Sequence, residues 1–127
     1  SPVGGETAKP CSASVTFGAQ AGAIAVGTFS DITIKTAFQI TGATLVGVPS
    51  GSLEIDILAV DISAFPPGPS DTICGSTPPA LVAALTYEDA TLTGWTTGVA
   101  ANTVLRFIVN SCSGVTNANL VINGTLL

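Results

Sequence analysis

Two carboxylates in one segment are the first residues whose types and spacing could do chemistry. Glu54 and Asp56 alternate with the apolar residues of the segment 53–57, and Asp61 follows soon after. In an extended chain, this alternation places both acids on one side and the apolar residues on the other. Paired carboxylates act in acid–base catalysis or bind calcium. A calcium site, however, draws several oxygens from one compact loop, and the sequence has no such loop motif. We therefore interpret the acids as the polar side of a strand and expect neither a catalytic site nor a metal site.

The nucleophilic residue types also lack the partners that catalysis needs. The chain has no histidine and no Gly-x-Ser-x-Gly motif, which excludes the usual serine–histidine arrangement. Its three cysteines, Cys11, Cys74 and Cys112, show no Cys-x-x-Cys spacing and cannot all pair within one chain. Two interpretations remain open: one disulfide with one free thiol, or three reduced thiols. We favour the second because a free cysteine packs as a small hydrophobe. We expect no enzymatic activity and no cofactor.

Two aromatic residues and one sequon could instead serve binding. Trp95 and Tyr87 could form a platform on which a sugar stacks, but a single tryptophan in a β-domain is more often a core residue because of its large apolar area. Asn123-Gly124-Thr125 matches the glycosylation sequon. In a strand-rich segment, Asn-Gly more simply marks a turn or a bulge.

The composition bounds the class of protein. The 127 residues suit one domain, and charged residues make up only 9% of them, against about 25% in an average globular protein. The net charge is −5 with three basic residues, which argues against nucleic-acid binding. No apolar run approaches the roughly 20 residues that span a bilayer, so we expect no membrane partner. So few charges lead us to expect that partner chains cover neutral or apolar surface.

Period-two alternation and β-branched residues predict strands along most of the chain. The predicted strands are 12–17, 24–29, 31–40, 43–48, 53–59, a bent strand at 91–96, 104–110 and 115–126, and residues 80–85 fit either a strand or a helical turn. Residues 49–51, Pro-Ser-Gly, predict a tight turn, which would join 44–48 and 53–59 as a hairpin. Residues 63–79 hold five prolines and predict a long irregular connection, in which Asp71 could cap one helical turn.

These patterns predict an all-β fold: a single antiparallel β-sandwich, jelly-roll-like, formed by residues 12–127. Residues 1–11 lack periodicity and predict an extended N-terminal arm. No segment of about ten residues has a clear helical period.

Several of these segments together resemble a β-module of structural proteins from tailed bacteriophages. The matching pieces are Gly51-Ser-Leu-Glu-Ile-Asp-Ile57, Pro66-Pro67, Asp71-Thr72-Ile73, Pro78-Pro79-Ala80-Leu81, Leu92-Thr-Gly-Trp-Thr96 and Phe107-Ile-Val-Asn-Ser111. The resemblance covers residues 51–126, and residues 1–48 match no pattern of the family. It implies a non-enzymatic virion protein that is assembled in the host cytoplasm, and it transfers no catalytic residues. A capsid decoration (cement) protein is the favoured interpretation. A tail or fibre subunit that takes part in host adsorption and a carbohydrate-binding module are the alternatives.

The sequence also predicts self-association, with a trimer as the expected form and a major capsid protein or another virion protein as a further partner. Leu105, Phe107 and Val109 share one side of their strand, so Val104, Arg106 and Ile108 are expected on the other. Symmetric association would bury that outward apolar side. The arm would then order against a neighbouring subunit.

Overall fold

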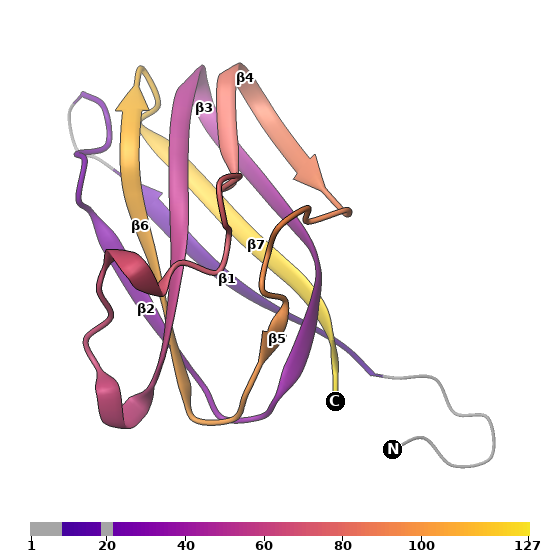
Figure 1. The fold of residues 1–127 in the computed structure, drawn as a ribbon. Coiled ribbons are helices and arrows are strands. Elements are labelled where there is room, and N and C mark those ends of the chain that lie inside the picture. The colour runs from indigo at the N-terminus through magenta and orange to yellow at the C-terminus, as the bar shows by residue number, and fades with distance from the viewer. Residues whose placement is uncertain (1–8, 19–21) are drawn as a thin grey trace.

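The computed structural model describes residues 9–18 and 22–127, and within them the fold is almost entirely antiparallel β-structure (Figure 1). The strands are β1 Pro10–Gly18, β2 Phe29–Ile34, β3 Phe38–Asp61, β4 Ala80–Asp89, β5 Gly98–Val99, β6 Thr103–Ser113 and β7 Asn117–Leu126. Two single-turn 3-10 helices, η1 Ile62–Ala64 and η2 Pro69–Asp71, are the helical segments of the described residues. The sheet order is β1-β7-β3-β6-β2, and β4 and β5 also pair with β3. The all-β prediction is therefore confirmed.

The long strand β3 builds the sandwich because it pairs with different strands along its two halves. Its first half pairs with β7, from Phe38 opposite Leu126 to Val48 opposite Asn117. Its second half pairs with β6 from Ser52 onward. Residues 114–116, which join β6 to β7, lie where β3 passes between the two ladders, and β4 pairs with β3 on both sides of the same point. The strands therefore bend together at one end of the molecule, at the top of Figure 1, and the sheet curls into two antiparallel layers.

Small residues allow the strands to approach one another at this bend. A Cβ atom at Gly51 would overlap the carbonyl oxygen of Ser113 and would lie 3.1 Å from Val115 Cγ2. A Cβ atom at Gly47 would lie 2.7 Å from Leu81 Cδ1. Glycine is required at Gly51 because a backbone oxygen lies too close for any Cβ atom, whereas at Gly47 the tip of the Leu81 side chain would have to move. The predicted tight turn at residues 49–51 is therefore wrong: these residues continue β3 through the bend.

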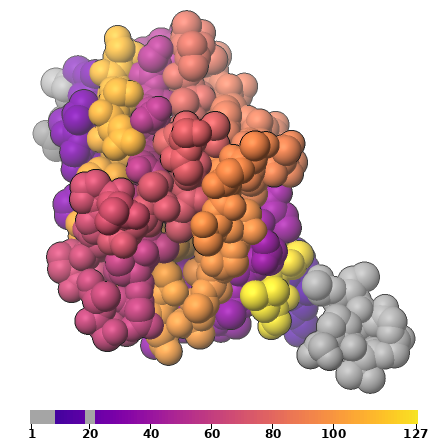
Figure 2. All heavy atoms as spheres, in the orientation of Figure 1, coloured from indigo at the N-terminus to yellow at the C-terminus, as the bar shows by residue number. Residues whose placement is uncertain are grey.

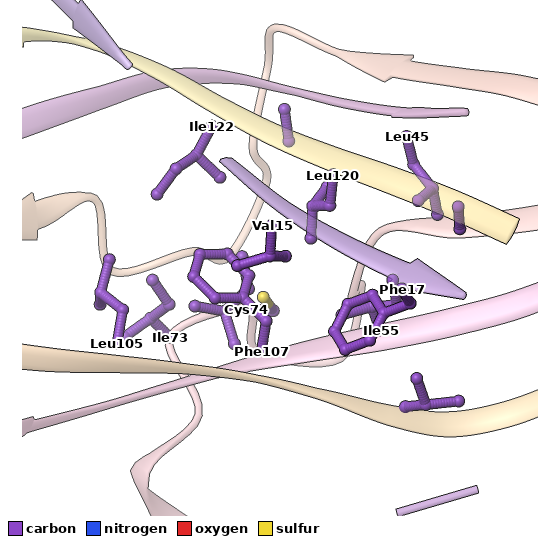
Figure 3. Packing of buried hydrophobic residues seen from close by; sticks show 14 of the residues in the cluster. Val15, Phe17, Leu45, Ile55, Ile73, Cys74, Leu105, Phe107, Leu120 and Ile122 are labelled. Atoms are coloured by element: carbon purple, nitrogen blue, oxygen red, sulfur yellow. The ribbon is translucent and has the colours of Figure 1, made fainter. Parts of the chain in front are cut away.

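The core fills the space between the two layers (Figure 3). It is formed by the alternate side chains that point inward, among them Val15, Phe17, Leu45, Ile55, Ile57, Leu105, Phe107, Leu120 and Ile122. Burial of each large side chain of this kind contributes about 1.5–3 kcal/mol to stability. Leu105, Phe107, Leu120 and Ile122 point inward as their strand patterns predict.

Other predicted boundaries needed correction. β1 begins at Pro10, so Pro10 and Cys11 pair with β7 rather than belonging to an arm, and the part of the predicted arm at residues 1–8 lies outside the described residues. The predicted strand at 24–29 is mostly a turn, in which Gly27 has a positive φ. The predicted strand at 31–40 is interrupted between β2 and β3.

The region 80–96 also differs from the prediction. Residues 80–89 form strand β4, which decides for the strand among the two alternatives at residues 80–85. Residues 91–96 form a turn rather than a bent strand: Leu92 has a φ of 53°, and the Trp95 amide donates to the Leu92 carbonyl at 3.1 Å. Asp71 is the last residue of η2, and its Oδ2 atom accepts from the Gly68 amide at 2.7 Å, so it caps the turn to which it belongs and not a turn that begins at residue 71.

The long connection between β3 and β4 covers the outer side of the second half of β3. Leu58 pairs with Thr72 in an isolated bridge, and the Ile73 amide donates to the Ile57 carbonyl at 2.9 Å. Figure 2 shows this connection and residues 90–97 spread over the near face of the molecule. Leu58 and Val104 are buried although neither belongs to the main core cluster. Val104, which was predicted to face outward for a partner, is therefore not available to one.

Candidate interaction surfaces

Glu54 and Asp56 lie on the outer side of β3, as the alternation predicts, but they serve separate contacts. A Glu54 carboxylate oxygen accepts from Asn110 Nδ2 on β6 at 3.1 Å. Asp56 Oδ1 accepts from the Thr72 hydroxyl at 2.6 Å and from the Ile57 amide at 2.8 Å. Among the described residues, no three His, Cys, Asp or Glu side chains gather in a group that could hold a metal ion. The hydrogen bond from Thr72 instead gives Asp56 a structural role, because it fixes the covering connection to β3.

Asp61 and Asp71 have similarly local roles. Asp61 Oδ2 accepts from both the amide and the hydroxyl of Ser63, which caps η1 and holds the pKa of Asp61 below its ordinary value. The acids of this region therefore shape the covering connection rather than forming a joint site.

Trp95 is a core residue and not a platform for a sugar. Its indole belongs to the core cluster and is 9% exposed, and its Nε1 donates to the Thr77 carbonyl at 3.0 Å. Tyr87 is half-buried, and its hydroxyl donates to Asp89 Oδ2 at 3.2 Å. Burial, together with the charge of Asp89, raises the pKa of Tyr87 to about 12. With the indole face inside the core, the sugar-stacking hypothesis for this pair is wrong.

The three cysteines are free thiols at different depths. Cys74 is fully buried in the core, whereas Cys11 and Cys112 are half-buried. Burial raises the pKa of the Cys74 thiol to about 12. A thiol with so high a pKa is a poor nucleophile at neutral pH, so Cys74 acts as a core residue.

The sequon residues lie in strand β7. Asn123 is exposed on β7, and a register shift between Ile40 and Gly42 places a bulge opposite Asn123 and Gly124. A Cβ atom at Gly124 would overlap the Gln39 carbonyl oxygen. The glycine is therefore required for close approach of the two strands at a bulge, as the simpler interpretation of Asn-Gly predicts.

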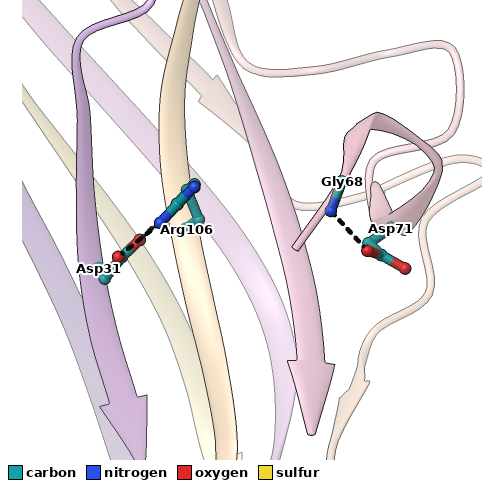
Figure 4. A network of polar contacts seen from close by, with 4 residues as sticks. All are labelled: Asp31, Gly68, Asp71 and Arg106. Atoms are coloured by element: carbon teal, nitrogen blue, oxygen red, sulfur yellow. Dashed lines mark hydrogen bonds and ion pairs between the residues drawn. The ribbon is translucent and has the colours of Figure 1, made fainter. Parts of the chain in front are cut away.

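Arg106 is held by its neighbours on the outer side of β6 (Figure 4). Its Nε and Nη2 atoms donate to the two Asp31 carboxylate oxygens at 2.8 and 3.0 Å, a bidentate pair that raises the pKa of the guanidinium. The guanidinium carbon also lies 3.9 Å from the centre of the Phe29 ring and 5.4 Å from that of Phe65. These contacts join β2, β6 and the segment after η1, so Arg106 is already occupied.

Charge is unevenly distributed over the surface. The residues of β2, the second half of β3, β6 and the covering connection include five carboxylates and one guanidinium: Asp31, Glu54, Asp56, Asp61, Asp71 and Arg106. We call this side the acidic face. Its single basic side chain is paired with Asp31, so the remaining acids set the sign of its potential.

On the opposite layer, the described outward side chains of β1, β7 and the first half of β3 include no ionisable group, and we call this surface the neutral face. It consists of the outward residues of β1, β7 and the first half of β3: Ser12, Ser14, Thr16, Thr44, Val46, Val48, Asn117, Asn119, Val121 and Asn123. They form cross-strand rows, such as Ser14 beside Val121 beside Thr44. The nearest acid in register is Glu88, which lies opposite Thr44 on the neighbouring strand β4.

An apolar groove opens at the end of the neutral face nearest the bend. Its volume is about 370 Å³, and its lining residues are Thr16, Val46, Gly47, Val48, Leu85, Thr86, Asn117, Ala118 and Asn119. Val46, Val48 and Leu85 are 40%, 54% and 50% exposed. Because these three apolar side chains line one groove, they differ from the isolated surface hydrophobes of ordinary proteins.

The structure therefore moves the candidate contact surface from the side of β6 that carries Val104 to the opposite layer. Val104 is covered by the chain, Ile108 is half-buried and Arg106 is paired. The signal for the neutral face was present in the sequence: the alternate positions of 12–16 and 117–123 hold only Ser, Thr, Asn and Val. It was missed because those strands could be assigned to one layer only after their pairing was known.

The chain shows little similarity to known proteins. No protein-family model matches it, and no curated protein matches it. Among solved structures, it is similar to a chain of the cyanophage Pam1 capsid asymmetric unit, with 15% identity and a TM-score of 0.42, over 100% of this chain and 92% of that one. A chain of infectious bursal disease virus strain Gx has 14% identity and a TM-score of 0.28, over 94% of this chain and 35% of that one. This chain thus spans about a third of the second protein's length. Similarity at this level establishes neither a shared fold nor a shared function.

The helical segments of the described residues are two short 3-10 turns. Neither η1 nor η2 is long and apolar enough to cross a membrane.

Proposed function

We propose that this chain is a non-enzymatic structural protein of a tailed-bacteriophage virion, a capsid decoration protein that stabilises the head through contacts with copies of itself and with a capsid protein. One observation carries the proposal: ionisable side chains are concentrated on the acidic face, while the opposite layer presents a broad neutral face with an apolar groove. A layer of this kind suits permanent contact with protein, because the core of an interface is depleted of charge.

The acidic face complements this arrangement. Its carboxylates keep the exposed side of an attached protein hydrated and discourage further association, because like charges repel. Conversely, the acids, thiols and aromatic residues that could do chemistry are each engaged in structural contacts at different places in the fold. The described part of the chain thus supports attachment better than catalysis.

The resemblance of residues 51–126 to a β-module of tailed-phage structural proteins supports a virion location. Within that class, decoration of the head suits a small single sandwich with one neutral face and one acidic face. Self-association, with a trimer as the expected form, is part of the proposal.

The test compares particles with and without this protein. If the protein decorates the head, particles that lack it should lose resistance to heat and to osmotic shock while they still adsorb to cells. Adding the purified protein back should restore resistance. Particles that keep their resistance but lose adsorption would replace this proposal with the tail or fibre alternative.

A further inference from the structure

The groove and the neutral face pose the question of what covers them. The apolar side chains Val46, Val48 and Leu85 line one groove and are exposed. Val82, which precedes Leu85 on β4, is 77% exposed, and Ala83 after it has a φ of 48°, so the backbone turns sharply there. The strand that contributes Leu85 to the groove therefore also carries a strongly exposed valine.

We infer that the occupant of this surface is a second copy of this chain, docked neutral face to neutral face with Val82 of each copy entering the groove of the other. Because each copy contributes the same surface, this contact is two-fold symmetric and joins copies in pairs, so it is distinct from the three-fold contacts of the expected trimer. The inference rests on the proposed function only in that both involve contacts between copies of the chain.

Charge favours this occupant. The chain has a net charge of −5, so two copies repel each other in most relative orientations. The outward residues of β1, β7 and the first half of β3 that meet in face-to-face docking carry no ionisable side chain, and Glu88 lies at the β4 edge of this surface. Docking in this way leaves the two acidic faces on the far sides of the pair, where they are farthest apart. An oppositely charged partner would instead be attracted to the acidic face.

The polar groups of the neutral face also suit burial. Asn119 Nδ2 already donates to the Val15 carbonyl at 3.1 Å and to the Thr16 hydroxyl at 3.2 Å. The Thr116 hydroxyl donates to the Val48 carbonyl at 3.2 Å. Because these donors have partners within the chain, covering them does not leave them without hydrogen bonds.

The size of the face matches a contact of modest strength. Three strands about 4.8 Å apart, each about 30 Å long, with the adjoining corner of β4, give roughly 500 Å² on each copy. The pair would therefore bury roughly 1,000 Å² in total, which is near the lower limit of specific interfaces. We expect dissociation constants in the micromolar to submillimolar range, as suits a contact that is repeated among many copies on a particle.

Sedimentation velocity of the full chain, from about 10 μM to about 1 mM, tests the inference. The wild-type chain should associate reversibly over this range. Val46→Lys, which places a charge in the groove, should raise the dissociation constant at least about tenfold. Ile62→Lys is the matched control, because it adds the same charge at an exposed position of η1 on the acidic face and should leave association unchanged. Val48→Lys repeats the test in case Val46→Lys unfolds, and thermal melts verify that each variant is folded.

Amide chemical shifts locate the contact. Shifts that depend on protein concentration should cluster on β1, β7 and the first half of β3. A wild-type chain that stays monomeric at 1 mM would overturn the inference and assign the face to another occupant. Equal weakening by Ile62→Lys, or shifts that cluster around Phe29 and Arg106, would overturn it as well. None of these outcomes decides whether the protein is part of the virion, so the particle experiment tests the proposed function separately.

Discussion

Substitution of Gly51 by alanine tests the bend that folds the sheet into two layers. An added Cβ atom would overlap the Ser113 carbonyl oxygen and would lie 3.1 and 3.2 Å from Val115 Cγ2 and N. Two of these three atoms are backbone atoms, one at the end of β6 and one in the connection from β6 to β7, so no side-chain rotation relieves the contact. The strands would have to separate where β3 passes from β7 to β6.

The expected cost follows from overpacking and from weakened pairing. Overpacking costs about 1–3 kcal/mol, and a weakened ladder hydrogen bond adds about 1 kcal/mol. We therefore expect Gly51→Ala to lower the free energy of unfolding by about 2–4 kcal/mol. For a chain of this size, each kcal/mol corresponds to about 4 °C, so the Tm should fall by roughly 8–15 °C.

Gly98→Ala is the matched control in urea unfolding and thermal melts. The nearest atom to its added Cβ would be Gln39 Oε1 at 3.9 Å, an ordinary contact, and its φ is not in the left-handed region. Its free energy of unfolding should change by less than about 0.5 kcal/mol, because nothing is displaced. If the two alanine variants were equally stable, the strands would not approach as closely as the structure shows, and our explanation of the bend would be wrong.

Three further predictions concern the core and its edges. Trp95→Ala should lower the free energy of unfolding by about 3–5 kcal/mol in urea titrations, because the indole fills the core; an unchanged midpoint would contradict this. The backbone N–H groups of Thr91 and Leu92 donate to Asp89 and hold the pKa of its carboxyl below the ordinary value. The ionised carboxyl therefore stabilises the fold fully above about pH 4, and this stabilisation is lost as the pH falls through the lowered pKa of the folded state. Asp89→Asn should therefore narrow the difference in stability between neutral and acidic pH, and an undiminished difference would refute this. A thiol reagent at pH 8 should react slowly with Cys74 and faster with half-buried Cys11 and Cys112; mass spectrometry of partly labelled protein would show the opposite order if our burial argument were wrong.

Local patterns predicted the strands whose two sides differ most. Residues 12–17 and 53–57 alternate apolar and polar side chains and lie in β1 and β3. The alternation has this power because one side of each strand enters the core while the other does not. The all-β fold class and these strands can therefore be predicted from the sequence.

The errors arose where distant strands decide the conformation. Pro49-Ser50-Gly51 resembles a turn, but β3 continues because β6, β7 and β4 bend beside it. Leu92 and Trp95 fit an alternating strand but are both buried in a turn. These outcomes depend on pairing between residues far apart in sequence, which local periodicity does not contain.

The candidate contact surface could likewise be predicted only in part. Periodicity placed Val104 and Arg106 on the outward side of their strand, and there it was correct about direction. It did not reveal that the connection after β3 covers that side, since the position of a long irregular segment depends on tertiary contacts such as the bond from Thr72 to Asp56. The neutral face became recognisable only when the pairing placed β1, β7 and the first half of β3 side by side.

Cryo-electron microscopy of the particle whose genome encodes this chain tests the central claim most directly. The proposed function predicts density for the curled sheet at regular positions on the outer surface of the head, with the neutral face in contact with protein. Particles whose heads lack this density, or in which the chain occupies only the tail, would contradict a decoration role.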